Sequence, residues 1–200
     1  MNNYTAIVDN GGANIASLLY AFERLQARAV VTTDATLIQS APRVLLPGVG
    51  AAADAMQRLR EHRLVDVIRK LTQPVLGICL GMQLLAEASE EENVECLGVL
   101  PGVAKRLAES PSTAVPNMGW CAIAERVPHP VLSGIDVGEY FYFLHSYALP
   151  LTEHTIATAT HTEEFAAVIS KDNFVAAQFH PERSSSAGAR ILQNFVESNS

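Results

Sequence analysis

The chain has 200 residues, of which 48% are hydrophobic and 18% are charged, and its formal net charge is −7. This composition predicts one globular domain over residues 1–200 with a single sizeable core, and it excludes an intrinsically disordered chain. Because the sequence has no basic patch or stripe, nucleic acid and anionic membrane surfaces are poor candidate partners.

The first half of the sequence alternates short apolar runs with segments of helical spacing. The apolar runs predict strands at residues 4–8, 29–31, 43–46 and 75–78. Helical periodicity covers residues 14–26, 54–71 and 80–88. Strands that alternate with helices indicate right-handed crossovers and a mostly parallel sheet.

From about Val94 onward, short alternating runs are separated by glycine and proline, which predicts antiparallel strands and hairpins. Lys171-Asp172-Asn173 is typical of a hairpin turn, and the acidic run 90–92 is interpreted as a solvated helix end or loop. A last helix is predicted after Ser186, with four apolar residues on one face: Ile191, Leu192, Phe195 and Val196.

The termini and cysteines indicate the compartment. The N-terminal ten residues lack the basic and apolar regions of a signal peptide, and no apolar run is long enough to cross a bilayer. Cys79, Cys96 and Cys121 are odd in number and show no CxxC spacing, so neither a disulfide framework nor a zinc site is expected. We therefore expect a cytoplasmic protein with no metal and no cofactor.

One cysteine lies where an apolar strand changes into an amphipathic helix, in the segment Gly77-Ile78-Cys79-Leu80-Gly81. This is the strand-turn-helix context of a nucleophile elbow, with sulfur in place of oxygen. The glycines permit a tight turn, and the N-terminal end of the helix favours a thiolate. The N–H of Leu80 is a natural oxyanion donor. On this segment alone, close packing and catalysis explain Cys79 about equally well.

A nucleophilic cysteine needs a base, and His180 is the best candidate among the six histidines. It ends an apolar strand, and Pro181 favours an extended backbone at His180. Residues two apart in an extended chain point to the same side, so Glu182 can orient the imidazole. A loop histidine beside an ordinary surface glutamate is the alternative.

A third segment, Pro47-Gly48-Val49-Gly50, also follows a predicted strand. Its glycines let peptide N–H groups point at a ligand, and a second oxyanion donor is expected around Val49 and Gly50. A plain turn would be the better explanation if this segment stood alone.

Together, "PGVG", "GICLGMQ" and "FHPE" resemble the class I glutamine amidotransferases, in an order that spans most of the chain. The resemblance implies a flavodoxin-like fold whose mostly parallel sheet has helices on both faces and antiparallel strands in its C-terminal half. It implies a triad of Cys79, His180 and Glu182 that hydrolyses L-glutamine through a γ-glutamyl thioester. It also implies that Gly48 and Gln83 contact the substrate.

Two further segments, "PNMGW" at 116–120 and "YFLHSY" at 142–147, are similar to one branch of that family. In that branch the glutaminase passes ammonia to a (βα)8-barrel cyclase of histidine biosynthesis, and the two subunits form a heterodimer. The resemblance implies that a peptide near Val49 reorients when the cyclase binds its ligand. It places four residues at the partner interface: Asn14, Trp120, Tyr142 and Arg183.

Three alternatives stay open on the sequence. A glutaminase could feed a different synthase, although "PNMGW" argues against that. A catalytically silent amidotransferase-like module could regulate a partner, although it would have no physical need for all three motifs. A cysteine hydrolase outside the family would explain the elbow around Cys79 but not the "HPE" segment at 180–182.

Overall fold

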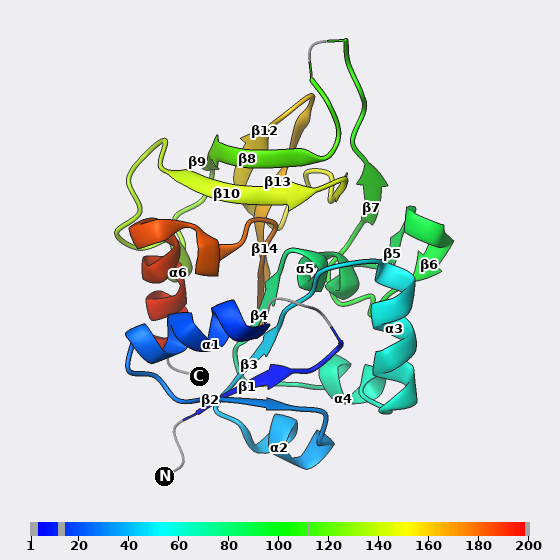
Figure 1. Cartoon of the computed structure of the whole chain (residues 1–200), viewed down its shortest axis with the longest axis vertical. Coiled ribbons are helices and arrows are strands. Elements are labelled where there is room, and N and C mark those ends of the chain that lie inside the picture. The colour runs from blue at the N-terminus through cyan, green and yellow to red at the C-terminus, as the bar shows by residue number, and fades with distance from the viewer. Residues whose placement is uncertain (1–3, 12–14, 112, 199–200) are drawn as a thin grey trace.

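The computed structural model describes residues 4–11, 15–111 and 113–198 (Figure 1). Its N-terminal half contains β1 (Thr5–Val8), α1 (Ile15–Arg24), β2 (Ala29–Thr32), α2 (Ala35–Ser40), β3 (Arg43–Leu46), α3 (Ala52–Glu61), α4 (Val65–Arg69), β4 (Val75–Ile78) and α5 (Leu80–Leu85). Its C-terminal half contains β5 (Ala88–Ser89), β6 (Val94–Glu95), β7 (Val103–Arg106), β8 (Asn117–Ala122), β9 (Ala124–Glu125), β10 (Tyr140–His145), β11 (Tyr147–Ala148), β12 (Thr155–Thr160), β13 (Glu164–Lys171), β14 (Phe174–Ala177) and α6 (Ser185–Glu197). Short 3-10 turns lie at Glu91–Asn93, Pro130–Leu132 and Pro181–Arg183.

The centre of the fold is an eight-stranded sheet in the order β2-β1-β3-β4-β14-β13-β12-β9. The strands from β2 through β14 pair in parallel, and those from β14 through β9 pair antiparallel. The predicted mostly parallel sheet with antiparallel strands in the second half is therefore confirmed. None of the described helices has both the length and the apolar character that crossing a membrane requires.

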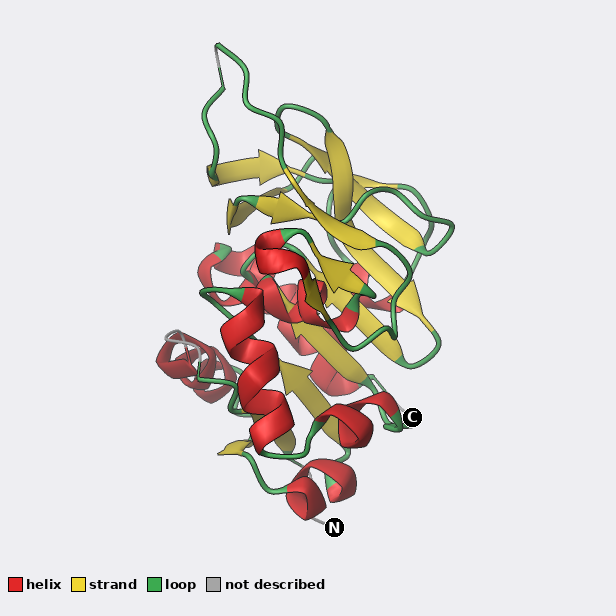
Figure 2. Ribbon diagram, turned by 90° about the vertical axis from the view of Figure 1, so that its right-hand side faces the viewer, coloured by secondary structure: helices red, strands yellow, loops and turns green. Residues whose placement is uncertain are grey.

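Helices cover both faces of the parallel part of this sheet (Figures 1 and 2). On one face, Leu18 and Phe22 of α1 and Leu192 of α6 pack against Ile7 and Leu76. The other face is covered by apolar residues of α2 to α5, and its core is continuous with Val44 and Leu46 of β3. Residues on alternate positions of β1 and β3 thus belong to different cores, as the two-residue period of a strand requires.

The C-terminal half adds a two-stranded ribbon, β8 paired with β10, which crosses the antiparallel strands β12 and β13 in the view of Figure 1. Phe141 and Phe143 of β10 are fully buried and contact the rings of Phe165 and Phe179. Aromatic pairs of this kind add stability beyond the burial of their area. The predicted turn after β13 is also confirmed, because Asp172 has a φ of 54° between β13 and β14.

Three sequence expectations about helices need correction. The segment 54–71 is not one helix, because Arg63 takes a φ of 56° and separates α3 from α4, while Leu64 is fully buried between them. The helix after Cys79 ends at Leu85 rather than at Ala88, since Ala86 is already extended. Helix α2 is absent from the sequence prediction, although Asp34 is a strong capping signal whose carboxylate accepts hydrogen bonds from two backbone N–H groups of its first turn.

The crossing of β4 and α5 is close because of two glycines. A Cβ on Gly81 would lie 1.8 Å from the carbonyl oxygen of Leu46, and one on Gly77 would lie 2.8 Å from Leu85 Cδ1. No larger residue fits between α5 and the end of β3 without moving backbone. The turn that holds Cys79 is therefore fixed against the sheet.

Replacing Gly81 by Ala should destabilise the fold strongly, because the new methyl group overlaps backbone rather than a flexible side chain. We expect the free energy of unfolding, measured with urea, to fall by about 3 kcal/mol or more. Gly138→Ala is the matched control: Gly138 has a φ of 79° and open space around its Cα, so its loss should be only about 1 kcal/mol. Equal losses in the two variants would contradict this account.

Candidate active site

The three sequence motifs follow three neighbouring strands. The loop 47–50 follows β3, Cys79 follows β4, and His180 lies just beyond β14, while β3, β4 and β14 are adjacent and parallel. Since parallel strands end at the same edge of a sheet, the three motifs meet there, where α/β proteins commonly bind ligands.

Cys79 occupies a backbone conformation that side-chain-bearing residues rarely adopt. Its φ is 51° and its ψ is −108°, between the end of β4 and the first residue of α5. The Cys79 N–H donates to the Ala177 carbonyl at 2.8 Å, which ties the turn to β14. Backbone strain of this kind persists only where the surroundings enforce it, and such strain clusters at functional sites.

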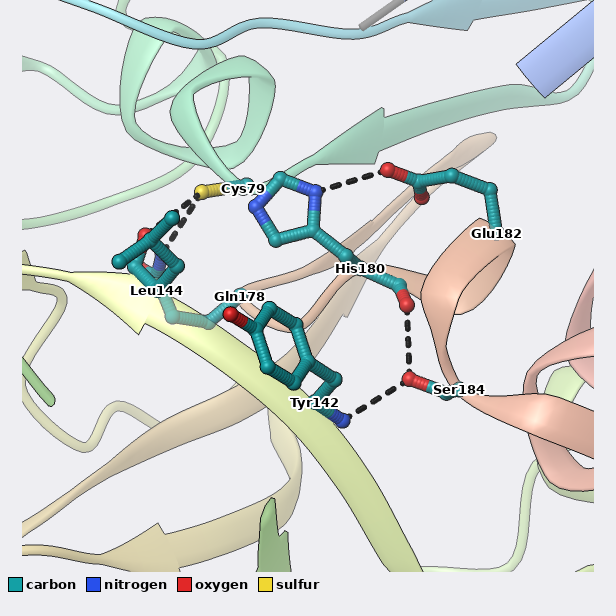
Figure 3. A network of polar contacts seen from close by, with 7 residues as sticks. All are labelled: Cys79, Tyr142, Leu144, Gln178, His180, Glu182 and Ser184. Atoms are coloured by element: carbon teal, nitrogen blue, oxygen red, sulfur yellow. Dashed lines mark hydrogen bonds and ion pairs between the residues drawn. The ribbon is translucent and has the colours of Figure 1, made fainter. Parts of the chain in front are cut away.

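The imidazole of His180 lies between the side chains of Cys79 and Glu182 (Figure 3). Its Nδ1 is 2.9 Å from Glu182 Oε1, and both side chains are buried. Burial alone lowers the pKa of His180, but hydrogen bonds with Cys79 and Glu182 and the charges of both outweigh it and raise the pKa to about 10. His180 therefore stays protonated at neutral pH and can deliver a proton to a leaving group.

A serine fixes the backbone of His180 from the other side (Figure 3). The Ser184 hydroxyl donates to the His180 carbonyl at 2.7 Å and accepts from the Tyr142 N–H at 2.9 Å. The His180 N–H donates in turn to the Tyr142 carbonyl at 2.9 Å. This closed set of bonds connects the candidate base to β10, and no sequence pattern indicates this role for Ser184.

A cavity of about 260 Å³ opens beside the sulfur of Cys79. It is large enough for a small molecule the size of an amino acid. The lining brings together predicted and unpredicted residues: Val49, Gly50, Cys79, Leu80, Gln83, Glu91, Pro116, Leu144, His145, Ser146, Tyr147 and His180.

The loop 47–50 is held at its two ends and unbonded in its middle. Asn10 Nδ2 donates to the Pro47 carbonyl at 2.6 Å, and Glu91 Oε2 accepts from the Ala52 N–H at 2.8 Å. Within the described residues, no hydrogen bond involves the N–H of Val49 or of Gly50. Because an N–H at the start of a helix has no intrahelical acceptor, the Leu80 N–H is also open to a ligand.

Not every predicted residue lines this cavity. Gly48 faces Leu80, whose Cβ would be 2.9 Å from a Cβ on Gly48, and it lines a smaller apolar cavity on the other side of the loop. The expected contact between Gly48 and the substrate stays a prediction. A glycine is required at position 48 because the loop backbone there lies close to Leu80 of α5.

Three of the four predicted interface residues form one cluster beside the cavity. Trp120 is half-exposed, its ring meets that of Tyr142 edge to face at 6.1 Å, and the guanidinium of Arg183 lies 5.4 Å from the Tyr142 ring centre. The fourth, Asn14, lies outside the described residues.

One cavity residue lies outside every motif of the sequence, and another lies in a motif that does not indicate its role. Glu91 belongs to the acidic run interpreted as solvated, yet its carboxylate lies at the cavity wall and bonds the first turn of α3. His145 lies in the "YFLHSY" segment, but the sequence does not indicate a role for its side chain, which is buried between Asn117 and the Tyr147 carbonyl. Among the described residues, no three His, Cys, Asp or Glu side chains gather as metal ligands would.

Residues 6–199 match the family model described as glutamine amidotransferase class-I, and the chain therefore belongs to the class I glutamine amidotransferases. Solved structures agree on the fold: a putative GMP synthase subunit from Thermoplasma acidophilum superposes with a TM-score of 0.76 at 17% identity, covering 98% of this chain and 94% of that one.

The sequence relatives are more specific. The imidazole glycerol phosphate synthase subunit HisH of Shewanella sediminis is 46% identical over 98% of this chain and 91% of its own length. The protein of the same name from Xanthomonas axonopodis pv. citri is 48% identical over 96% of both chains.

Replacing Glu182 by Gln should lower the pKa of His180, since Glu182 is one of the two groups that raise it. A raised pKa contributes stability that is complete below the unfolded value near 6.5 and is lost as pH rises through about 10. The difference in free energy of unfolding between wild type and Glu182→Gln should therefore be larger at about pH 7 than above about pH 10.

Urea unfolding at stepped pH measures this difference, and an NMR titration of the His180 ring gives the pKa directly. The control is Glu109→Gln, because Glu109 is exposed and pairs with Arg106. A difference for Glu182→Gln that did not change with pH would show that this carboxylate does not set the protonation of His180.

Proposed function

We propose that this chain is the glutaminase subunit of an imidazole glycerol phosphate synthase, and that it hydrolyses L-glutamine to glutamate and ammonia. The observation that carries the proposal is Cys79, with its strained backbone, beside the His180–Glu182 pair at the wall of an amino-acid-sized cavity. The relatives at 46% and 48% identity share the subunit name, which favours this synthase over another.

In the first half of the reaction, the S–H proton of Cys79 resides on His180, and the Cys79 thiolate attacks the side-chain amide carbon of glutamine. The carbonyl oxygen becomes an oxyanion, which the Leu80 N–H and an N–H of Val49 or Gly50 stabilise. His180 then gives its proton to the amide nitrogen. The C–N bond breaks, ammonia leaves, and a γ-glutamyl thioester remains on Cys79.

In the second half, His180 is neutral and accepts a proton from a water molecule as its oxygen attacks the thioester carbon. The C–S bond breaks, its electron pair returns to sulfur, and glutamate leaves. Glu182 orients the His180 ring through the bond to Nδ1.

The cavity supports glutamine as the substrate. The Glu91 carboxylate at its wall is the natural partner for the α-ammonium group, since opposite charges that are partly desolvated attract strongly. Gln83 Nε2 already bonds the Tyr147 carbonyl, so its oxygen is the group left for the substrate. The whole chain then acts as one catalytic domain.

The partner is a (βα)8-barrel cyclase that receives ammonia in its interior and forms imidazole glycerol phosphate in histidine biosynthesis. Delivery inside a closed, cytoplasmic complex is chemically reasonable, because free ammonia at neutral pH is mostly ammonium. The exposed face of the β8–β10 ribbon, at the cavity mouth, suits docking of this partner. We call it the docking face, and it consists of Met118, Trp120, Tyr140, Tyr142 and Leu144.

The loop 47–50 suits regulation by that partner. Its ends are held by Asn10 and Glu91, while Gly50 has a φ of 93° and open space around its Cα. A peptide in the middle can therefore rotate without moving the rest of the site. In the proposed complex, this rotation aims the second oxyanion donor when the cyclase binds its ligand.

Replacing Cys79 by Ala should abolish glutamine-dependent synthesis by the complex, with a loss of at least about a thousandfold, because the nucleophile is gone. Synthesis from added ammonium should stay near the wild-type rate, since the cyclase is untouched. Assays of imidazole glycerol phosphate formation with each nitrogen source measure both.

The matched control is Cys96→Ala, since Cys96 is buried in the core away from the cavity and should keep glutamine use. Loss of both nitrogen sources in Cys79→Ala would point to a structural role for Cys79. Unimpaired glutamine use in that variant would refute the proposed function.

Replacing Trp120 by Ala should weaken binding to the cyclase about tenfold or more, because half-exposed tryptophans at the centre of apolar faces commonly dominate binding energy. Isothermal calorimetry with the purified cyclase measures the dissociation constant. Leu37→Ala is the control, because Leu37 is also partly exposed and its helix, α2, lies at the opposite end of the molecule from β8 and β10 (Figure 1). Equal affinity of both variants would place the interface elsewhere.

A further inference from the structure

We infer that Gln178 is a further catalytic residue, whose side-chain amide donates a hydrogen bond to the Cys79 sulfur and stabilises its thiolate. This inference rests on the proposed function. Gln178 is fully buried, and its Nε2 lies 3.7 Å from Cys79 Sγ, a normal distance for a nitrogen donor and sulfur (Figure 3). Buried amides are kept in proteins where both their ends have partners.

The direction of the Gln178 amide follows from its neighbours. The Tyr147 carbonyl can only accept, so the Gln83 atom 2.9 Å from it is the donor Nε2. The same Gln83 nitrogen lies 3.3 Å from Gln178, which must present its acceptor Oε1 to it. The other end of the amide, the Nε2 donor, therefore faces Cys79.

The far end of this chain of bonds is also fixed. His145 Nδ1 lies 2.9 Å from the Tyr147 carbonyl and His145 Nε2 lies 3.1 Å from Asn117 Nδ2. Burial lowers the pKa of His145 to about 4, against a smaller opposing effect of its bond to Tyr147. The neutral His145 ring thus donates from Nδ1 and accepts at Nε2. Each hydrogen bond in the series that runs from Asn117 through His145, the Tyr147 carbonyl and Gln83 to Gln178 therefore has one allowed direction.

The thiol and the thiolate use these contacts differently. A neutral Cys79 can donate its S–H to the Leu144 carbonyl, 3.7 Å away, whereas a thiolate cannot donate and only accepts. The hydrogen bond from the Gln178 N–H to the thiolate is then charge-assisted. Such hydrogen bonds are stronger in a buried site than in water.

The same bond serves both halves of the reaction. It favours the attacking thiolate, and it stabilises the sulfur again when the C–S bond of the thioester breaks and the electron pair returns to it. The oxygen of Gln178 meanwhile holds Gln83 at the cavity wall. One buried amide therefore connects the nucleophile to the substrate side of the site.

The test is the pH dependence of Cys79 alkylation by iodoacetamide in the full chain, followed by mass spectrometry of the Cys79 peptide. Gln178→Met keeps the side-chain length and removes the N–H, and Gln178→Leu is a second apolar replacement. We expect alkylation at about pH 6 to slow about tenfold in both, with rates above about pH 9 unchanged. Circular dichroism identifies the variants that keep the wild-type fold.

The matched control is Gln57→Met, because Gln57 is exposed on α3 and bonds only Glu61 among the described residues. Its alkylation profile should equal that of the wild type. A wild-type profile in folded Gln178→Met or Gln178→Leu would overturn the inference, as would an equal slowing at all pH values, which indicates altered access. Alkylation needs no glutamine. The experiment therefore tests the Gln178–Cys79 hydrogen bond even if the proposed glutaminase function is wrong.

Discussion

The contact between α5 and the carboxyl end of β3 determines the positions of the catalytic thiol and of the loop beside it. Because Gly81 lets the helix lie against the Leu46 carbonyl, the turn at Cys79 comes within reach of the loop 47–50 that follows the same strand. The thiol and the two candidate sources of oxyanion donors are thereby placed by one backbone approach. The strained φ of Cys79 is the local consequence of this arrangement.

Around this contact, the site divides into a rigid part and a movable part. His180 is held by Glu182 at its ring and by Ser184 and the Tyr142 backbone at its main chain. The loop 47–50, by contrast, is held only at its ends among the described residues. In the proposed enzyme, chemistry needs the first part fixed, whereas control by a partner needs the second part free.

The sequence predicts those features that short local patterns encode. Short apolar runs flanked by proline or glycine predict the bounds of β3 and β4. They also predict that Cys79, His180 and the loop 47–50 lie at strand ends. The break at Arg63 escapes prediction because neither glycine nor proline marks it. The roles of Gln178 and Glu91 are not predicted for another reason. Gln178 bonds Cys79, 99 residues away in sequence, and Glu91 bonds Ala52, 39 residues away. No local sequence pattern covers such distances.

The docking face also has a consequence for the relative amounts in which the cell makes this protein and its partner. Before the proposed complex forms, Met118, Trp120 and Tyr140 are all more than half exposed to water on one face of the ribbon. Apolar surfaces of this kind promote self-association when they stay uncovered. An excess of this protein over its cyclase would leave this apolar face uncovered and open to self-association. Balanced synthesis of the two proteins therefore protects solubility as well as the supply of ammonia.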